Sequence, residues 1–360
     1  RNFLNFLHKY ILFCNIICFI IFTNMTLKIG IIGLGVMGAD HANIIYSKTA
    51  NSTISAVYDS NIEHAQNISK LIGNPQVKDT ADELINSPDV DAIMIISPDE
   101  THAELTLKCI DQKKPVLCEK PLSHSVTECK NIIDAEEKKG KRLVQVGYMR
   151  RFDPSYLEMK KNLNTQNFGK ALLLHCVHRQ INAPGFFKSL MSITNGLVHE
   201  FDIIRWLLET EIVEIEIIKS SIRKQLDYVD PLLVIIKCAN GTIVDVEYNS
   251  NTYGYDVKAE LVCEEGTIIM SPPRKNELMS SKKHFFSYAN DWRPRFADAY
   301  RNQNQAWINS IVNNTISEGS SAWDGLIAAK IAEAGVKSFE QEKSIIIELQ
   351  KIPDFYKIKK

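Results

Sequence analysis

Three glycines near the start of the chain have the spacing of a nucleotide-binding loop. Gly33-Leu34-Gly35-Val36-Met37-Gly38 lies between an apolar run and a helical stretch. In this pattern the first glycine permits a tight turn, the second lets the backbone approach a pyrophosphate, and the third lets helix and strand pack closely. The free N–H groups at the start of that helix, at Val36 and Met37 among others, favour negative charge. The loop is therefore predicted to bind a dinucleotide.

Asp59 indicates which dinucleotide is bound. It ends the next apolar run, about 20 residues after the glycines, where a carboxylate accepts hydrogen bonds from the adenosine ribose hydroxyls and repels a 2′-phosphate. The sequence therefore predicts NAD in preference to NADP. The alternative is that Asp59 only forms the turn that contains Ser60 and Asn61.

A further loop, from Ser97 to His102, follows another apolar run. Ser97-Pro98 ends one run, and Thr101-His102 opens the next helix. Ligands of open parallel sheets lie at the carboxyl ends of the strands, so Ser97, Pro98 and His102 are expected along the cofactor. For His102 the alternative is a helix-start residue without a chemical role.

The next run ends in Cys118-Glu119-Lys120-Pro121. A lysine at the carboxyl edge of a parallel sheet would lie beside the nicotinamide, and Glu119 is expected next to the cofactor. The ammonium of Lys120 can donate a hydrogen bond to a substrate hydroxyl and stabilise a developing alkoxide. Lys120 is therefore a predicted catalytic residue.

With the glycine loop before it, Glu119-Lys120-Pro121 resembles the signature of the glucose-fructose oxidoreductase, inositol dehydrogenase and rhizopine-catabolism family. The similarity looks closest to the inositol 2-dehydrogenases and extends from about Leu27 to Tyr356. Unrelated two-domain dehydrogenases lack the four further stretches that carry it. These are Gly147-Tyr148-Met149-Arg150-Arg151-Phe152-Asp153, Tyr253-Gly254-Tyr255-Asp256, Phe296-Ala297-Asp298-Ala299-Tyr300 and Ser321-Ala322-Trp323-Asp324-Gly325.

The resemblance implies a catalytic histidine in a second domain. Inositol-type members carry Asp-x-x-x-His at the start of a helix, followed by a further Asp, where this chain reads Asn195-Gly196-Leu197-Val198-His199-Glu200-Phe201-Asp202. The spacing of four places positions 195 and 199 on one helical face. His199 would act as general base for the substrate hydroxyl, since an ordinary histidine pKa suits that work near neutral pH, with Lys120 as its electrostatic partner.

Asn195 departs from the family pattern. An ionised Asp would stabilise an imidazolium and orient its ring, whereas an amide orients the ring without compensating its charge. We expect a less basic His199, slower turnover or a shifted substrate, and a gain of turnover in Asn195→Asp. Asn195 is also a favoured helix N-cap residue, and the two roles are compatible.

Four substrate-contacting positions of the family are also matched, and polyol binding needs several such groups around a shaped pocket. They are His178, Arg150, Asp202 and one of Tyr253 or Tyr255. Structural alternatives remain for some of them. Asp202 would then pair with Arg205, and the tyrosines would be half-buried residues of a sheet.

Elements of two kinds must hold these residues. Short apolar runs alternate with amphipathic stretches up to about Tyr148, which indicates βαβ units and a doubly wound parallel sheet. The expected strands are Leu27–Ile32, Ile54–Tyr58, Ala92–Ile96, Val116–Cys118 and Leu143–Val146, with helices such as Ala103–Gln112 and Val126–Lys139 between them.

After residue 168, longer strands with turn signals between them predict an antiparallel sheet. The expected strands are Lys170–His178, Ile212–Ile222, Leu232–Cys238, Thr242–Asn249, Asp256–Cys263 and Thr267–Met270, and the expected helix among them is Leu197–Leu208. A last helical pair, Ala297–Ile311 and Ala322–Phe339, is expected to pack on the first domain.

The predicted fold class is α/β, with two domains. Residues 25–148 would form an NAD-binding Rossmann domain, and residues 149–345 an α+β domain for substrate binding and oligomerisation, followed by a tail at 346–360. By resemblance, the second domain has an open, mostly antiparallel sheet that covers the substrate and assembles homo-oligomers, often tetramers. Residues 1–24 hold an apolar run before Met25 and are expected to be an upstream leader.

The composition excludes several classes of partner. In 360 residues, 45% are hydrophobic, 24% are charged and the net charge is -1, so there is no electrostatic argument for nucleic acid or an anionic membrane as the main partner, since these need a concentrated positive face. A small-molecule polyol or sugar is the expected partner, and the cytoplasm the expected location. The eight cysteines include no Cys-x-x-Cys pair, so we expect reduced thiols and no metal site.

Three functions are compatible with these patterns. The first is NAD-dependent oxidation of myo-inositol, or a close cyclic polyol, to the ketone 2-keto-myo-inositol. The second is dehydrogenation of another sugar or sugar derivative in the same family, because the pocket decides the substrate. The third is NAD binding by a regulatory relative without turnover, against which the presence of both Lys120 and His199 argues.

Overall fold

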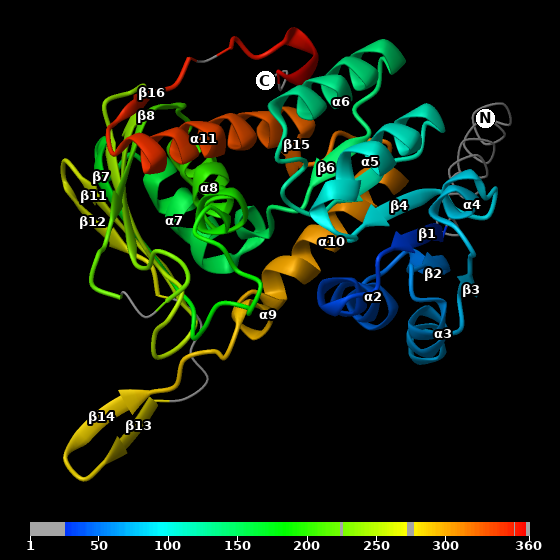
Figure 1. Cartoon of the computed structure of the whole chain (residues 1–360), viewed down its shortest axis with the longest axis horizontal. Helices are drawn as coiled ribbons and strands as arrows, with labels where there is room; N and C mark the ends of the chain where they lie inside the picture. The colour runs from blue at the N-terminus through cyan, green and yellow to red at the C-terminus, as the bar shows by residue number, and fades with distance from the viewer. Residues whose placement is uncertain (1–25, 224–225, 272–276, 349, 358–360) are drawn as a thin grey trace, which may run out of the picture.

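The computed structural model describes residues 26–223, 226–271, 277–348 and 350–357, so the predicted leader at 1–24 lies outside the described residues. Two seven-stranded sheets dominate the molecule, and helices pack on each of them (Figure 1). Six strands of the first sheet come from residues 27–146 and its seventh from residues 320–321, whereas the second sheet is formed by residues 171–346.

The first sheet is built around β1 (Leu27–Ile32), which pairs in parallel with β2 (Ser52–Tyr58) and β4 (Ala92–Ile95). Its remaining parallel strands are β3 (Gln76–Val77), β5 (Val116–Cys118) and β6 (Val144–Val146), in the order β6-β5-β4-β1-β2-β3. This order reverses between β1 and β4, and ligands of doubly wound sheets bind at that reversal. The predicted Rossmann domain is confirmed.

Helices cover both faces of the first sheet, so its central strands are apolar on both sides. In β4, for example, all four residues are buried. The helices are α2 (Val36–Lys48), α3 (Ile62–Leu71), α4 (Ala81–Asn86), α5 (His102–Asp111) and α6 (Val126–Lys139).

A seventh strand joins the first sheet from far along the chain. β15 (Ser320–Ser321) pairs antiparallel with β6, a contact that the sequence did not predict. Ser321 then caps α11 (Ala322–Gln341) through a reciprocal capping box with Asp324. Since α11 packs against α6 on one side and against the second domain on the other, it joins the two halves (Figure 1).

The second sheet has the order β12-β11-β7-β10-β9-β8-β16. Its strands are β7 (Ala171–Arg179), β8 (Ile212–Lys219), β9 (Leu232–Cys238), β10 (Ile243–Asn249), β11 (Asp256–Cys263), β12 (Gly266–Ile269) and β16 (Ile345–Ile346). The predicted, mostly antiparallel sheet is confirmed, and among its described strands the one parallel pair is β10 with β7. The chain crosses from β7 to β8 through a helix, and the meander β8-β9-β10 then brings β10 back in the direction of β7. The strand predicted to reach Ile222 ends at Lys219.

One face of the second sheet packs on helices and the other is open (Figure 1). The covering helices are α7 (Pro154–Asn164), α8 (Val198–Leu208) and α11. Side chains therefore alternate between buried and exposed along β9. The open face carries large apolar residues, including Leu173, Ile218, Leu233 and Ile243.

The chain then returns to the first domain. A hairpin of β13 (Glu277–Ser280) and β14 (Lys283–Phe286) projects from the body of the molecule (Figure 1). After it, α9 (Trp292–Arg295) leads into α10 (Ala297–Val312), which packs against α2. The prediction that the last helical pair packs on the first domain is confirmed.

The glycine loop has the geometry that its sequence predicts. Gly33 has a φ of 89°, and a Cβ there would lie 2.5 Å from the carbonyl oxygen of Ile96. A Cβ on Gly38 would lie 2.0 Å from the carbonyl oxygen of Gly33. Gly35, in contrast, has nothing within 4 Å of a Cβ position, so the space beside it is open.

Gly38→Ala tests this loop. The new methyl group would meet a backbone carbonyl that cannot rotate away, so we expect a lower melting temperature and at least tenfold weaker NAD binding, a change of about 1.4 kcal/mol or more. Differential scanning fluorimetry and a titration with NAD measure the two effects. Gly185→Ala is the matched control, since a Cβ there meets nothing within 4 Å. Unchanged NAD affinity in Gly38→Ala would contradict the role of the loop.

Candidate active site

Asp59 lies at the glycine loop and also forms the turn that follows it. Its Oδ2 accepts a hydrogen bond from the Leu34 N–H at 2.8 Å, and its Oδ1 accepts one from the Asn61 N–H at 2.9 Å. The turn interpretation of Asp59 is confirmed, and the same contacts anchor its carboxylate beside the loop, where the predicted ribose contact would need it.

The start of α2 fits a phosphate group. Gly35 provides no side-chain cap for the helix, so the N–H groups of the first turn, which Val36 and Met37 open, are left to a ligand. Met37 Sδ accepts a hydrogen bond from the Trp292 indole at 2.9 Å, which ties the loop to the second domain. With the open space at Gly35 and the carboxylate of Asp59, these residues fit a dinucleotide.

His102 joins the two loops at the carboxyl edge of the sheet. Its ring nitrogens lie 2.9 Å from the Ser97 carbonyl oxygen and 2.7 Å from the Pro121 carbonyl oxygen. Both partners are acceptors, so both ring nitrogens must donate, which requires the imidazolium. Burial lowers the pKa of His102, but Cys118, the Pro121 carbonyl and Asp99 raise it to about 10. His102 is thus more than a helix-start residue, since it holds the Ser97-Pro98 loop against the loop that carries Lys120.

Glu119 is buried behind Lys120. Its Oε1 lies 3.0 Å from His41 Nε2, on the helix that follows the glycine loop, and its Oε2 accepts a hydrogen bond from the Lys120 N–H at 3.1 Å. Asn304 Nδ2 in turn lies 3.0 Å from the other nitrogen of His41. Glu119 therefore connects the nucleotide loop to the lysine.

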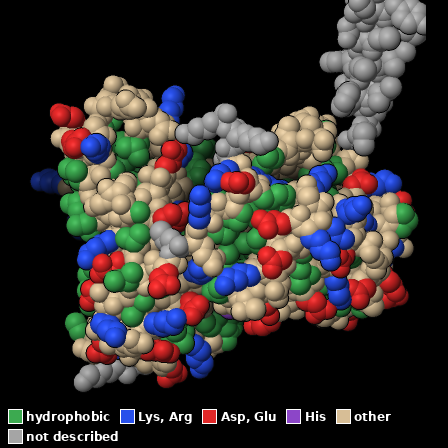
Figure 2. Space-filling view, turned by 90° about the horizontal axis from the view of Figure 1, so that it is seen from above, with side chains coloured by type: hydrophobic (Ala, Val, Ile, Leu, Met, Phe, Trp, Pro, Cys, Tyr) green, Lys and Arg blue, Asp and Glu red, His purple; other side chains and the backbone are tan. Residues whose placement is uncertain are grey.

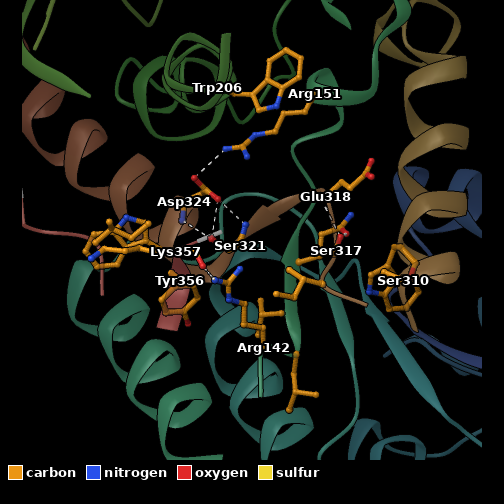
Figure 3. Close-up of a pocket in the computed structure, with 18 of the residues that line it drawn as sticks. Arg142, Arg151, Trp206, Ser310, Ser317, Glu318, Ser321, Asp324, Tyr356 and Lys357 are labelled. Atoms are coloured by element: carbon orange, nitrogen blue, oxygen red, sulfur yellow. Dashed lines mark hydrogen bonds and ion pairs between the residues drawn. The ribbon is translucent and has the colours of Figure 1, made fainter. Parts of the chain in front are cut away.

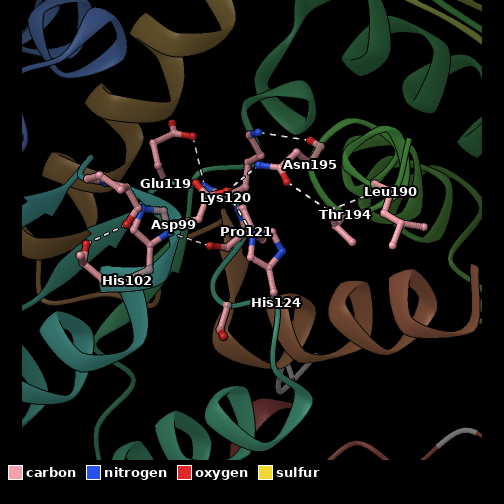
Figure 4. Close-up of polar contacts among 12 residues, drawn as sticks. Asp99, His102, Glu119, Lys120, Pro121, His124, Leu190, Thr194 and Asn195 are labelled. Atoms are coloured by element: carbon pink, nitrogen blue, oxygen red, sulfur yellow. Dashed lines mark hydrogen bonds and ion pairs between the residues drawn. The ribbon is translucent and has the colours of Figure 1, made fainter. Parts of the chain in front are cut away.

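Lys120 points from the first domain toward the second (Figure 4). Its Nζ donates a hydrogen bond to the backbone oxygen of Asn195 at 3.2 Å. Its positive charge also lowers the pKa values of both His178 and His199.

Asn195 does not have the position that the sequence predicts. It lies inside a π-helical turn, Ser192–Gly196, and the N-cap of α8 is Leu197, so the N-cap interpretation is wrong. Its Nδ2 donates to Asp99 Oδ2 at 2.5 Å, and its Oδ1 accepts from Thr194 Oγ1 at 3.2 Å. The side chain is engaged in these contacts, and none of them orients the His199 ring.

His199 is buried at the start of α8. Its Nδ1 has no hydrogen-bond partner among the described residues, and its ring meets the edge of Tyr148 at 6.1 Å between centroids. Burial and the positive charges of Arg150, Lys120 and His178 hold the pKa of His199 well below its usual value. The imidazole is therefore neutral at neutral pH, as a general base must be.

His178 and Arg150 meet in one buried cluster with Glu200. Nδ1 of His178 lies 3.2 Å from Arg150 Nη2 and 3.1 Å from Glu200 Oε1, and Arg150 also forms an ion pair with Glu200. Burial would raise the pKa of Glu200, but Arg150 and His178 lower it to about 2. The cluster adjoins His199, so the structure brings Arg150, His178, His199 and Lys120 together.

The two candidate tyrosines have different environments. Tyr255 is buried, with its ring 6.0 Å from that of His178. Tyr253 is 62% exposed, and its hydroxyl accepts a hydrogen bond from Arg179 at 2.7 Å. Of the pair, the structure places Tyr255 at the site.

Asp202 belongs to a separate ion-pair network. Its carboxylate accepts two hydrogen bonds from Arg151, at 2.5 and 2.9 Å, and one from Ser320 at 3.0 Å. The predicted structural alternative, a hydrogen-bonded pair with Arg205, is wrong, because Arg205 bonds to Glu211 and Asp324. The structure therefore does not bring Asp202 into contact with the histidines.

A cavity of about 910 Å³ lies beside that network and not at Lys120 (Figure 3). Its lining includes Arg142, Arg151, Asp324 and Tyr356, and none of the candidate catalytic residues lines it. Its arginines are already engaged, since Arg142 donates to the backbone oxygens of residues 355 and 357, and Arg151 pairs with Asp324. The cavity is therefore a weaker candidate for substrate binding than the site at Lys120.

Sequence reasoning missed three residues of the site, namely Glu200, Asp99 and Tyr148. Glu200 had a usable signal, because a buried Arg150 needs a carboxylate partner and Glu200 follows His199 directly. Asp99 had none, since its partner Asn195 is 96 positions away in the chain.

Three observations concern other ligands and surfaces. The described residues hold no group of His, Cys, Asp or Glu arranged for a metal ion, and the six described cysteines are buried free thiols. Within the same ranges, no helix has the length and apolar character needed to cross a membrane. Basic and acidic side chains are interspersed on the face shown in Figure 2.

The network position of Asp202 predicts the effect of Asp202→Asn. Loss of the Asp202 charge leaves the buried guanidinium of Arg151 only partly neutralised. We therefore expect the free energy of unfolding to fall by about 3 kcal/mol. KM for the polyol should stay within about threefold, because Asp202 does not reach the histidine cluster. Urea unfolding and steady-state kinetics measure both, with the exposed Asp111→Asn as control. A normal stability with a much higher KM would instead make Asp202 a substrate ligand.

Comparison with known families supports this geometry. The family model described as "Oxidoreductase family, NAD-binding Rossmann fold" matches residues 27–148, and the model of the same family's C-terminal alpha/beta domain matches residues 161–347.

Individual proteins resemble the chain over nearly its whole length. Inositol 2-dehydrogenase 1 of Saccharopolyspora erythraea is 41% identical over 337 residues, which cover 92% of this chain and 99% of that protein. Inositol 2-dehydrogenase of Pseudomonas fluorescens is 38% identical over 338 residues, with 92% and 100% covered. The crystal structure of myo-inositol dehydrogenase from Lactobacillus casei in complex with NAD(H) and myo-inositol superposes with a TM-score of 0.89 at 30% identity, covering 92% of this chain and 100% of that one.

Proposed function

Because this chain belongs to the GFO/IDH/MocA oxidoreductase family, we propose that it oxidises myo-inositol to 2-keto-myo-inositol with NAD as acceptor. Membership of the family confirms the resemblance that the sequence indicated, together with the NAD-binding Rossmann domain and the dehydrogenase class. Among the alternatives, dehydrogenation of another sugar differs only in what the pocket accepts.

One observation carries the assignment of roles, namely that Lys120 of the first domain reaches the second domain, where its Nζ donates to the backbone oxygen of Asn195, four residues before His199. The positive charge of Lys120 also lowers the pKa of His199, which supports this assignment. When bound, NAD accepts the hydride of the carbon that is oxidised. Lys120 would donate a hydrogen bond to the reacting hydroxyl and stabilise negative charge on its oxygen, while the neutral His199 would accept its proton.

The histidine cluster would orient the ring of the substrate. Arg150 and Glu200 hold His178 in place, and Tyr255 packs near it. A cyclic polyol presents several hydroxyls of fixed direction, and a rigid set of donors and acceptors distinguishes their stereochemistry. A buried cluster built on β7, α8 and the segment after β6 provides such rigidity.

Homo-oligomer formation and a cytoplasmic location are part of this proposal. The open face of the second sheet presents Leu173, Ile218, Leu233 and Ile243 to solvent, and an exposed apolar surface of this kind favours association. A tetramer built on this face would agree with the family resemblance.

Lys120→Met tests the assigned chemistry. The wild-type enzyme should form NADH with inositols and not with aldoses such as glucose. Lys120→Met should lower kcat/KM for inositol by about 10²–10⁴-fold, because the stabilisation of the alkoxide is lost. NAD affinity, measured by calorimetry, should remain within about threefold. Activity on glucose alone would favour the sugar-dehydrogenase alternative, and NAD binding without turnover on any polyol would favour a regulatory protein.

The pH dependence of kcat/KM tests His199. Its pKa lies below the usual 6.5, so the neutral base persists as the pH falls and activity should decline only well below pH 6.5. His199→Gln should lose about 10²–10⁴-fold in kcat, while His175→Gln, at a half-exposed histidine on the second sheet, serves as control. An acid limb at pH 6.5 or above in the wild type would argue against His199 as the base.

A further inference from the structure

A carboxylate from the first domain lies at the lysine end of the site. Asp99 belongs to the short 3₁₀ turn Asp99–Thr101 that follows β4. Its Oδ2 accepts a hydrogen bond from Asn195 Nδ2 at 2.5 Å and lies 3.2 Å from His124 Nε2 (Figure 4). The side chain of Asp99 is 26% exposed, so it is neither deeply buried nor part of the outer surface.

The groups that face Asp99 are neutral donors or cations. They are His124 on the loop after Lys120, Asn195 on the second domain, and the charges of Lys120 and His102. Burial alone would raise the pKa of Asp99, but these four groups lower it. Asp99 is therefore ionised at neutral pH and contributes one negative charge beside the ammonium of Lys120.

Asn195 is bound from two sides by the first domain. Its backbone oxygen accepts the hydrogen bond of Lys120, and its side-chain amide donates to Asp99. An amide can donate to an ionised carboxylate, whereas a second ionised carboxylate at the same place cannot donate and would repel it. Asn195 is thus the chemical complement of Asp99.

We infer that Asp99 is a positioning residue for the proposed oxidation: its carboxylate holds the side-chain amide of Asn195, whose backbone oxygen binds Lys120, and thereby keeps Asn195 and Lys120 in register across the domain boundary. This inference rests on the proposed function for its kinetic consequences. The contact between Asp99 and Asn195 itself does not depend on the substrate.

The expected effect of Asn195→Asp is now reversed. From the sequence alone, a carboxylate at position 195 was expected to raise turnover. With Asp99 at hydrogen-bond distance, two carboxylates would share the site, and one of them would have to take up a proton. Asn195→Asp alone should therefore lower kcat/KM, and only a simultaneous Asp99→Asn should restore it.

A charge swap tests this inference with four variants of the full chain. They are Asp99→Asn, Asn195→Asp, the double variant with both changes, and Asp89→Asn as a control on an exposed aspartate of the same domain. Each single variant should lose roughly tenfold in kcat/KM, the size of one charge-assisted hydrogen bond. The double variant should recover to within about threefold of the wild type, because one carboxylate and one amide again face each other.

The pH profile separates positioning by charge from a general structural role. Asn195→Asp should show an additional ionisation on the acid side of its pH–kcat profile, from the shared carboxylate pair, and the double variant should not. A faster Asn195→Asp enzyme, or a double variant no better than the worse single one, would overturn the inference.

Thermal unfolding without substrate keeps this test independent of the proposed function. Each single variant should lower the melting temperature by about 2–4 °C, and the double variant should restore it. If the wild type oxidises no inositol, the proposed function is wrong. A restored melting temperature in the double variant would still support the interaction between Asp99 and Asn195. Additive losses of stability would show that Asp99 and Asn195 do not interact.

Discussion

The candidate site depends on the imidazolium of His102 and its two backbone acceptors. The loops after β4 and β5 end next to each other because their strands are neighbours, but strand pairing alone does not determine how their tips lie. His102 donates to one carbonyl in each loop, so the turn that carries Asp99 and the segment that carries Lys120 form one unit. A buried cation held by two carbonyl dipoles is a strong constraint at this low dielectric.

Lys120 and His178 are each held by partners that take no part in the proposed chemistry. Glu119 holds the backbone of Lys120, and Arg150 with Glu200 holds His178. Only His199 has a buried ring nitrogen, Nδ1, without a partner among the described residues of the cluster. Arg150 Nε is likewise without a hydrogen-bond partner within the described ranges, but among the two atoms only the nitrogen of a neutral imidazole can accept a proton, which is consistent with proton transfer at His199.

Local signals in the sequence predicted much of the fold. The helix Val126–Lys139 was predicted with its observed ends, because Ser125 caps its start and Gly140, with a φ of 68°, terminates it. Periodicity did not predict β15, since two residues give no pattern, nor the parallel pairing of β7 with β10, which depends on the path of the chain. Asn195 was recognised as unusual, but its partner Asp99 is distant in sequence and only the folded chain brings the two together.

The short strand β15 has a consequence for motion. It adds an edge to the nucleotide-binding sheet from a segment that continues directly into α11, and α11 packs beneath the second sheet. Any wide opening between the halves would have to break this edge pairing and lift the helix as well. Substrate exchange is therefore expected to proceed through small rearrangements of side chains and loops, with the two halves unfolding in a single cooperative step.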